Sequence, residues 1–229
     1  MKVAILGDIH GDVEYLNIAL DIARSVGAEM MIQLGDFGFD YRDSFLTGIA
    51  QSSDTYEIPI LVVRGNHDDP GRFTSYAKVR NVHFIPDGFV TTIGKKVVAF
   101  LGGAVSIDRA ARKENISWWR NERVNPHIVN AWSIDDVKAD VLISHEAPLM
   151  PDNLPNLFSL SSSVTRDCDE DRNIVRTAAE ILEPDVIYHG HYHFRHTKTL
   201  FMGDDRKALV EGLDCNHADL NDSLIIREF

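Results

Sequence analysis

The sequence contains very little cysteine and no long apolar segment. Its 229 residues include two cysteines, Cys168 and Cys215, which form no CxxC pair. This scarcity argues against a disulfide-stapled fold and against a thiolate zinc site. No stretch approaches the roughly 18 apolar residues of a membrane-spanning helix, and the apolar run at residues 1–6 is too short for a signal peptide. We therefore expect a soluble protein of a reducing cytoplasm, with no membrane partner.

Positive charge is also in short supply. The chain has 23 Lys and Arg against 35 Asp and Glu, which gives a formal net charge of −12. Such a balance disfavours an extended nucleic-acid track. The hydrophobic fraction of 44% and the charged fraction of 25% are typical of folded proteins. We expect a single domain spanning residues 1–229, because this length suits one α/β domain with a large core.

Short apolar runs bounded by Gly, Asp or Pro alternate with helical patterns. An apolar stripe at helical spacing predicts helices over residues 12–26 and 171–182, and the middle and end of the chain look β-rich at 82–92, 97–105 and 224–229. This alternation predicts an α/β fold with a mixed sheet or two stacked sheets. The runs that read as buried strands are 3–6, 30–34, 60–63, 97–101, 141–143 and 186–188.

Two polar stretches are expected to have structural roles and to contribute no catalytic residues. Residues 150–163, rich in Pro, Asn and Ser, are expected to form a long loop over a site. The charged run 166–172 is expected to be a solvated helix start.

The most informative polar residues directly follow predicted strands. Ligands of open α/β sheets bind outside the carboxyl ends of the strands, so five such loops would bring their side chains together at one edge. Glycines in these loops permit sharp turns and close backbone approach. The candidates are Asp8, His10, Asp36, Asn66, His67, His145, His191 and His193.

Oxygen and imidazole donors without a thiolate suit Mn²⁺, Fe, Zn²⁺ or Ni²⁺. The donors outnumber one tetrahedral shell, so we expect a two-metal centre with ions about 3.5–4 Å apart, of the kind that clamps the oxygens around phosphorus. Of these ions we expect two Mn²⁺, with Fe, Zn²⁺ and Ni²⁺ as the alternatives.

In chain order, the motifs resemble those of the calcineurin-like metallophosphoesterase superfamily. The resemblance implies a four-layer α/β/β/α sandwich with metals at the strand ends. Each motif alone is common by chance, whereas all five in order, each after a predicted strand, are specific. The matching segments are Asp8-Ile9-His10, Gly35-Asp36, Gly65-Asn66-His67-Asp68, His145 and Gly190-His191-Tyr192-His193.

The resemblance also implies roles. Asp36 would bridge the ions, and His67, which is not a ligand in this family, would bind phosphate and protonate the leaving oxygen. A hydroxide bridging the metals would attack phosphorus in line. One ion would be held by Asp8, His10, Asp36 and His193, and the other by Asp36, Asn66, His145 and His191.

The sequence departs from the protein phosphatases of this superfamily at one point. Those enzymes carry an Asp and an Arg soon after the bridging Asp, and here Asp40 and Arg42 are displaced by one and two positions. Either Asp40 or Asp68 could orient His67. Arg64 matches the phosphatase-like Arg-Gly-Asn-His string and is a candidate phosphate ligand, with a loop-supporting salt bridge as the alternative.

Segment 108–123 holds five basic and three acidic residues together with Trp118 and Trp119. It could guide a phosphorylated substrate through Arg109, with a Trp face for a base to stack upon. The alternative is a surface helix with two core tryptophans.

Several polar residues have a structural explanation. Asp12 and Asp69 are expected to cap helices. The remaining histidines are expected not to bind metal, with His189 adjacent to the site or structural; they are His83, His127, His189, His196 and His217.

The leading hypothesis is therefore a binuclear metal-dependent phosphoesterase acting on a small phosphodiester or phosphomonoester, such as a nucleotide. A protein Ser/Thr phosphatase acting on a phosphoprotein is the alternative. A nuclease and a scaffold that has lost catalysis are weaker hypotheses, because of the acidic charge and because every ligand position is filled. The oligomeric state does not follow from the sequence.

Overall fold

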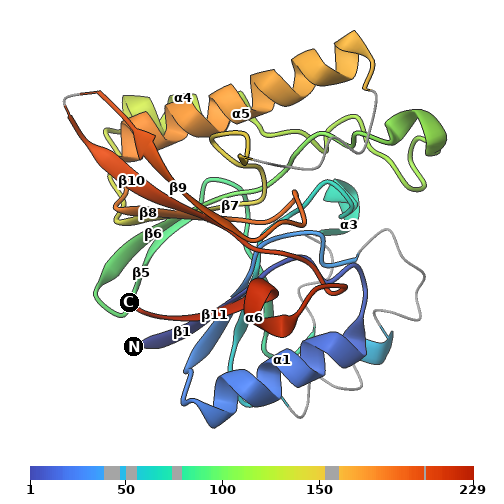
Figure 1. The fold of residues 1–229 in the computed structure, drawn as a ribbon, viewed down its shortest axis with the longest axis vertical. Helices are drawn as coiled ribbons and strands as arrows, with labels where there is room; N and C mark the ends of the chain where they lie inside the picture. Colours follow the sequence, from blue (N-terminus) through green and yellow to red (C-terminus); the bar gives the residue numbers. More distant parts are fainter. Residues whose placement is uncertain (39–46, 50–55, 74–78, 153–159, 204) are drawn as a thin grey trace.

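The computed structural model describes residues 1–38, 47–49, 56–73, 79–152, 160–203 and 205–229. Two stacked β-sheets form its centre, with helix α1 beneath one sheet and helices α4 and α5 above the other (Figure 1). The first sheet has the order β11-β1-β2-β3-β4 and the second β5-β6-β7-β8-β10-β9. Within the described residues, no helix is long and apolar enough to cross a membrane.

The first sheet is parallel except at one edge. Strands β1 to β4 run parallel, and β11 pairs with β1 in the antiparallel direction. Its strands are β1 (Lys2–Leu6), β2 (Met30–Gln33), β3 (Ile60–Val62), β4 (Val82–Phe84) and β11 (Leu224–Glu228).

The second sheet is also mixed. Its central strands β6, β7, β8 and β10 are parallel, and antiparallel strands form both edges. Its strands are β5 (Val90–Ile93), β6 (Lys96–Leu101), β7 (Val141–Ser144), β8 (Val186–His189), β9 (His196–Phe201) and β10 (Lys207–Gly212).

The longer helices are α1 (Val13–Ser25), α4 (Pro126–Ile134) and α5 (Ser162–Leu182). Short helical turns occur at α3 (Pro70–Phe73), η1 (Arg109–Ala111) and α6 (Leu220–Ser223). The expected caps are confirmed: Asp12 accepts a hydrogen bond from the Tyr15 N–H at the start of α1, and Asp69 accepts one from the Gly71 N–H at 2.8 Å.

Side-chain alternation along the strands produces three apolar layers, because successive residues of a strand face opposite sides of its sheet. In β1, Val3 and Ile5 pack between the two sheets, whereas Ala4 and Leu6 pack toward α1. In β7, Ile143 faces the other sheet and Leu142 faces α4 and α5. The α/β/β/α order expected from the family resemblance is confirmed, and of the two arrangements that the sequence left open the structure has two stacked, mixed sheets.

The structure differs from the expectations in three places. Residues 82–92 do not form one unit, because β4 and β5 lie in different sheets. Helix α5 starts at Ser162, so the run 166–172 lies inside it, and Asp171 is fully buried instead of solvated. Strands β9 and β10 and helix α4 were not predicted. The middle of the expected 150–163 loop, residues 153–159, lies outside the described residues.

Candidate metal centre

Five of the parallel strands end beside one another and deliver the candidate ligands. The loops after β1, β2 and β3 come from the first sheet and carry Asp8, His10, Asp36 and Asn66. The loops after β7 and β8 come from the second sheet and carry His145, His191 and His193. The centre therefore lies where the carboxyl ends of the two sheets meet.

Four of these side chains form a compact cluster. One ligand atom from each of Asp8, His10, Asp36 and His193 lies within 4.8 Å of the others. The Nε2 atom of His193 is 3.1 Å from Asp8 Oδ2 and 2.9 Å from His10 Nε2. Two imidazoles meeting beside two carboxylates form a donor set that a divalent cation would satisfy.

The backbone of this cluster is held in an unusual conformation. Four candidate ligands adopt the left-handed region, with φ of 46° at His10, 51° at Asp36, 69° at His191 and 47° at His193. Residues other than glycine rarely occupy this region, although Asp, Asn and His enter it more readily than most, and such conformations cluster at active sites. The surrounding loops therefore impose these conformations.

Glycines let the loops approach one another closely. A Cβ atom at Gly65 would lie 2.1 Å from both the backbone nitrogen and Oδ1 of Asp36. A Cβ atom at Gly190 would lie 2.1 Å from Oδ1 of Asp8. Both positions require glycine because a candidate ligand occupies the space that a side chain would take.

Asp36 also faces a second group of donors. Its Oδ1 atom is 3.4 Å from His145 Nε2, which in turn is 3.0 Å from Asn66 Oδ1. The rings of His145 and His191 lie 5.1 Å apart. The carboxylate of Asp36 thus stands between the other three members of the compact cluster and this second group.

A buried chain of hydrogen bonds sets the direction of the Asn66 amide. Its Nδ2 donates to Ser106 Oγ at 3.0 Å, and the Ser106 hydroxyl donates to Glu122 Oε2 at 2.8 Å. Because the amide nitrogen is engaged on that side, the amide oxygen is the atom that faces His145. Sequence reasoning did not find Ser106 or Glu122.

Two other buried polar residues were also missed. The Gln33 side chain donates to the carbonyl of Gly7 and accepts from the N–H of Gly35, so it joins the loops after β1 and β2. Glu146 is fully buried, and its Oε2 is 3.7 Å from His191 Nε2. A polar residue at the end of a buried strand was the only signal available for either.

For three of these side chains, burial and the charges of neighbouring groups act on the pKa in opposite directions. Burial opposes the charge of His145, but the carboxylates of Asp36 and Asp8 outweigh it and raise the imidazole pKa to about 9. Burial likewise opposes the charge of His193, and the hydrogen bond with Asp8 prevails and raises its pKa to about 11. Burial would raise the pKa of Asp36, yet His67 and His145 hold it well below its usual value.

His67 lies at the side of the cluster. Its backbone N–H donates to Asp36 Oδ1 at 2.8 Å, and its ring Nε2 is 3.9 Å from Asp36 Oδ2. The guanidinium of Arg112 lies against the ring. Of the two acids considered for orienting His67, Asp40 lies outside the described residues, and Asp68 accepts hydrogen bonds from the backbone of Phe37, Gly38 and Gly65.

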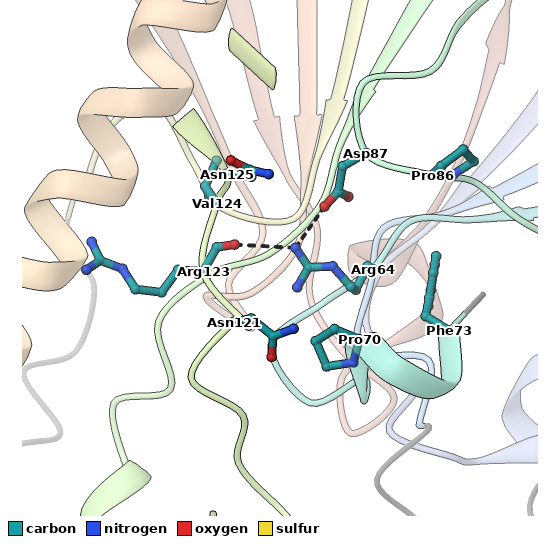
Figure 2. A pocket seen from close by; sticks show the side chains of 9 residues that line it. All are labelled: Arg64, Pro70, Phe73, Pro86, Asp87, Asn121, Arg123, Val124 and Asn125. Atoms are coloured by element: carbon teal, nitrogen blue, oxygen red, sulfur yellow. Dashed lines mark hydrogen bonds and ion pairs between the residues drawn. The ribbon is translucent and has the colours of Figure 1, made fainter. Parts of the chain in front are cut away.

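The two arginines proposed as substrate ligands are engaged elsewhere. The guanidinium of Arg64 donates to Asp87 Oδ2 at 2.9 Å and to the carbonyl of Arg123 at 3.3 Å. Figure 2 shows Arg64 pointing toward both partners. Arg64 borders a cavity of about 410 Å³, and none of the candidate metal ligands lines this cavity. Arg64 therefore makes the loop-supporting salt bridge that was the alternative. Arg109 pairs with Asp167 on α5 at 2.6 Å, so neither arginine is placed at the cluster.

Segment 108–123 is not the surface helix considered as its alternative. Its only helical turn among the described residues is η1, and the rest is loop, turn and bend with an isolated β-bridge between Glu114 and Trp118. Trp119 is buried and contributes to the interior, whereas Trp118 is half-buried with Arg120 6.0 Å from its ring.

None of the remaining histidines belongs to the compact cluster of four described side chains. His189 is buried, burial lowers its pKa to about 3, and its Nε2 is 3.3 Å from His196 Nε2. His83, His127 and His217 are exposed.

Comparison with known proteins agrees with this arrangement. A family model described as calcineurin-like phosphoesterase matches residues 1–195. No curated protein matches the chain at a significant level. Similar solved structures share the fold at low sequence identity. A Thermus thermophilus protein has a TM-score of 0.58 at 15% identity and covers 99% of this chain and 98% of its own.

Two further structures carry functional descriptions of their own. A dimetal phosphatase from Danio rerio has a TM-score of 0.56 at 11% identity, covering 99% of this chain and 91% of that one. The NAD nucleotidase of Haemophilus influenzae has a TM-score of 0.53 at 10% identity, covering 100% of this chain and 49% of that one. At these identities the likeness concerns the fold alone.

Proposed function

Because the chain belongs to the calcineurin-like phosphoesterase family, we propose that it is a binuclear metal-dependent hydrolase of small phosphate esters, with Mn²⁺ as the favoured ion. One observation carries the proposal: Asp36 lies between the cluster of Asp8, His10 and His193 and the group formed by Asn66 and His145. A single carboxylate with imidazole or amide donors on both sides is suited to joining two cations.

The donor set fits divalent transition metals. It contains carboxylate, amide and imidazole groups and no thiolate, and its atoms are close enough for one ion to reach four of them. When bound, the ions would polarise phosphoryl oxygens and lower the pKa of a water molecule.

The protein residues would position the ester and move the proton. His67 lies beside Asp36 with 18% of its side chain exposed, so it is accessible to a bound ester. In the proposed reaction, its imidazole donates a proton to the leaving alcohol oxygen, which prevents an alkoxide from forming.

The test compares loaded and stripped protein. Purified protein is freed of metal with a chelator, reloaded with Mn²⁺, and assayed with p-nitrophenyl phosphate and bis(p-nitrophenyl) phosphate. We expect hydrolysis that depends on added metal. Full activity after thorough metal removal, or no activity with any divalent ion, would overturn the proposal.

A panel of natural ester classes separates the alternatives. Phosphomonoesters, phosphodiesters, 2′,3′-cyclic nucleotides and a phosphopeptide are compared under the same conditions. The formal net charge of −12 supports a compact substrate over a long nucleic acid. Preferential hydrolysis of the phosphopeptide would favour the protein phosphatase alternative.

A further inference from the structure

The loop that follows η1 brings an arginine against His67. The Nη2 atom of Arg112 is 2.5 Å from His67 Nε2, and its Nη1 atom is 3.0 Å from His67 Nδ1. Segment 108–123 stood out in the sequence as a basic stretch in an acidic chain, and Arg112 is the member that reaches the candidate centre.

The contact between Arg112 and His67 brings hydrogen-bond donors of the two side chains together. A guanidinium has only donors, and a neutral imidazole has one acceptor nitrogen, so at least one of the two close contacts brings two donors together. The carboxylate oxygen Oδ2 of Asp36 lies 3.9 Å from His67 Nε2, beyond hydrogen-bond distance. An oxyanion bound beside the pair would accept hydrogen bonds from both side chains and would relieve this contact between donors.

The guanidinium is held in place from its other side. Its Nε atom pairs with Asp108 Oδ1 at 2.7 Å, and Nη1 also donates to the carbonyl of Ser117 at 3.1 Å. The side chain of Arg112 keeps 12% of its surface exposed, and that of His67 keeps 18%. The pair is therefore anchored but still accessible to a ligand.

We propose that Arg112 binds a non-bridging phosphoryl oxygen of the substrate and makes the enzyme prefer phosphomonoesters to phosphodiesters. This inference rests on the proposed phosphoesterase function. A monoester has two negative charges and a third free phosphoryl oxygen, whereas a diester has one charge and an organic group in that position. The forked guanidinium interacts more strongly with the monoester because charge-assisted hydrogen bonds strengthen with the negative charge on the acceptor oxygens.

The decisive comparison uses two substrates with the same leaving group, p-nitrophenyl phosphate and bis(p-nitrophenyl) phosphate. In Mn²⁺-loaded protein, Arg112→Ala should lower kcat/KM for the monoester about tenfold more than for the diester. Arg112→Lys, which keeps the charge without the fork, should give a smaller change in the ratio. Arg120→Ala is the matched control, because Arg120 lies in the same segment, is 77% exposed and pairs with Glu114.

A binding measurement gives a readout independent of turnover. Titration calorimetry with inorganic phosphate should show weaker binding to Arg112→Ala than to wild type, and unchanged binding to Arg120→Ala. An unchanged ester ratio in both Arg112 variants of an active enzyme would overturn this inference while leaving the phosphoesterase function intact. Wild-type protein inactive on both esters would instead contradict the proposed function, and unchanged phosphate binding in Arg112→Ala would then still refute the role of Arg112.

Discussion

Asp36 lies beside both groups of donors in the candidate centre. It is 1% exposed, has a positive φ, and faces His145 and His67 as well as the compact cluster. Its pKa is held well below the usual range by His67 and His145 against the effect of burial. A charged Asp36 is therefore available to cations at neutral pH.

Asp36→Asn should abolish joint binding of two ions and lower hydrolysis by at least about a hundredfold, because the amide lacks the negative charge. Asparagine tolerates a left-handed backbone, so the fold should persist. Metal content per chain and turnover of bis(p-nitrophenyl) phosphate check this. Asp205→Asn is the control, since Asp205 is exposed and has a φ of 59°. Two ions bound to Asp36→Asn would contradict the bridging role.

His67→Ala should retain metal but lose about 10²–10⁴-fold in turnover on esters with poor leaving groups, because the proton donor is gone. The loss should shrink for p-nitrophenyl phosphate, whose leaving group needs little protonation. Comparing that substrate with phenyl phosphate measures the difference. His83→Ala, at an exposed histidine of β4, should behave as wild type. Normal turnover of phenyl phosphate by His67→Ala would refute the acid role.

Metal binding should release protons and weaken as the pH falls. The raised pKa values of His145, about 9, and His193, about 11, mean that both imidazoles carry protons at pH 7 in the metal-free protein, and metal ligation requires neutral rings. The stabilisation from protonated His145 is complete below its unfolded pKa and is lost as the pH rises through about 9. Calorimetry in two buffers of different ionisation enthalpy measures proton release. A Mn²⁺ affinity independent of pH between 6 and 8 would contradict this account.

At the scale of elements, loops rather than strands carry the chemistry, and their spacing depends on glycine. The loop after β3 touches the loop after β2 through Gly65, and the carboxylate of Asp68 joins the same two loops through three backbone N–H groups. Their relative position is therefore specified by residues that are not themselves candidate ligands.

Gly65→Ala should destabilise the fold by about 1–3 kcal/mol and lower the affinity for Mn²⁺, because its Cβ would overlap the backbone of Asp36. Gly203→Ala is the matched control, as nothing lies within 4 Å of its added Cβ, and its effect should stay within about 0.5 kcal/mol. Urea unfolding and Mn²⁺ titration measure both effects. Normal Mn²⁺ affinity in Gly65→Ala would show that the two loops can separate without harm.

At the scale of the whole molecule, the candidate centre joins the two sheets. Asp8, Asp36 and Asn66 follow strands of the first sheet, whereas His145 and His193 follow strands of the second. Bound ions would therefore act as crosslinks between the sheets in addition to their chemical role.

Mn²⁺ should raise the thermal stability of the protein. At a free concentration of one hundred times Kd, linkage predicts about 2.7 kcal/mol of stabilisation per site. Melting curves with Mn²⁺ and with a chelator measure the shift in Tm. The shift should be largely absent in Asp36→Asn, and an equal shift in that variant would indicate that the ions bind elsewhere.

Sequence alone was sufficient for the parts of the protein that depend on local pattern. Short β-branched runs predict the strands because run length and side-chain branching are properties of neighbouring residues, and strands β1 and β7 include two of the predicted runs. The donors at strand ends were also foreseeable, since parallel strands bring their carboxyl ends to one edge. The family resemblance added the order of the four layers.

Only the tertiary structure decided which residues support those donors. The segment 82–92 divides between two sheets, Arg112 rather than Arg109 reaches His67, and Ser106 with Glu122 orients Asn66. The partners in these contacts are separated by 16 to 45 residues along the chain. Contacts at such separations are selected by the packing of whole loops against the sheets, and no local periodicity encodes them.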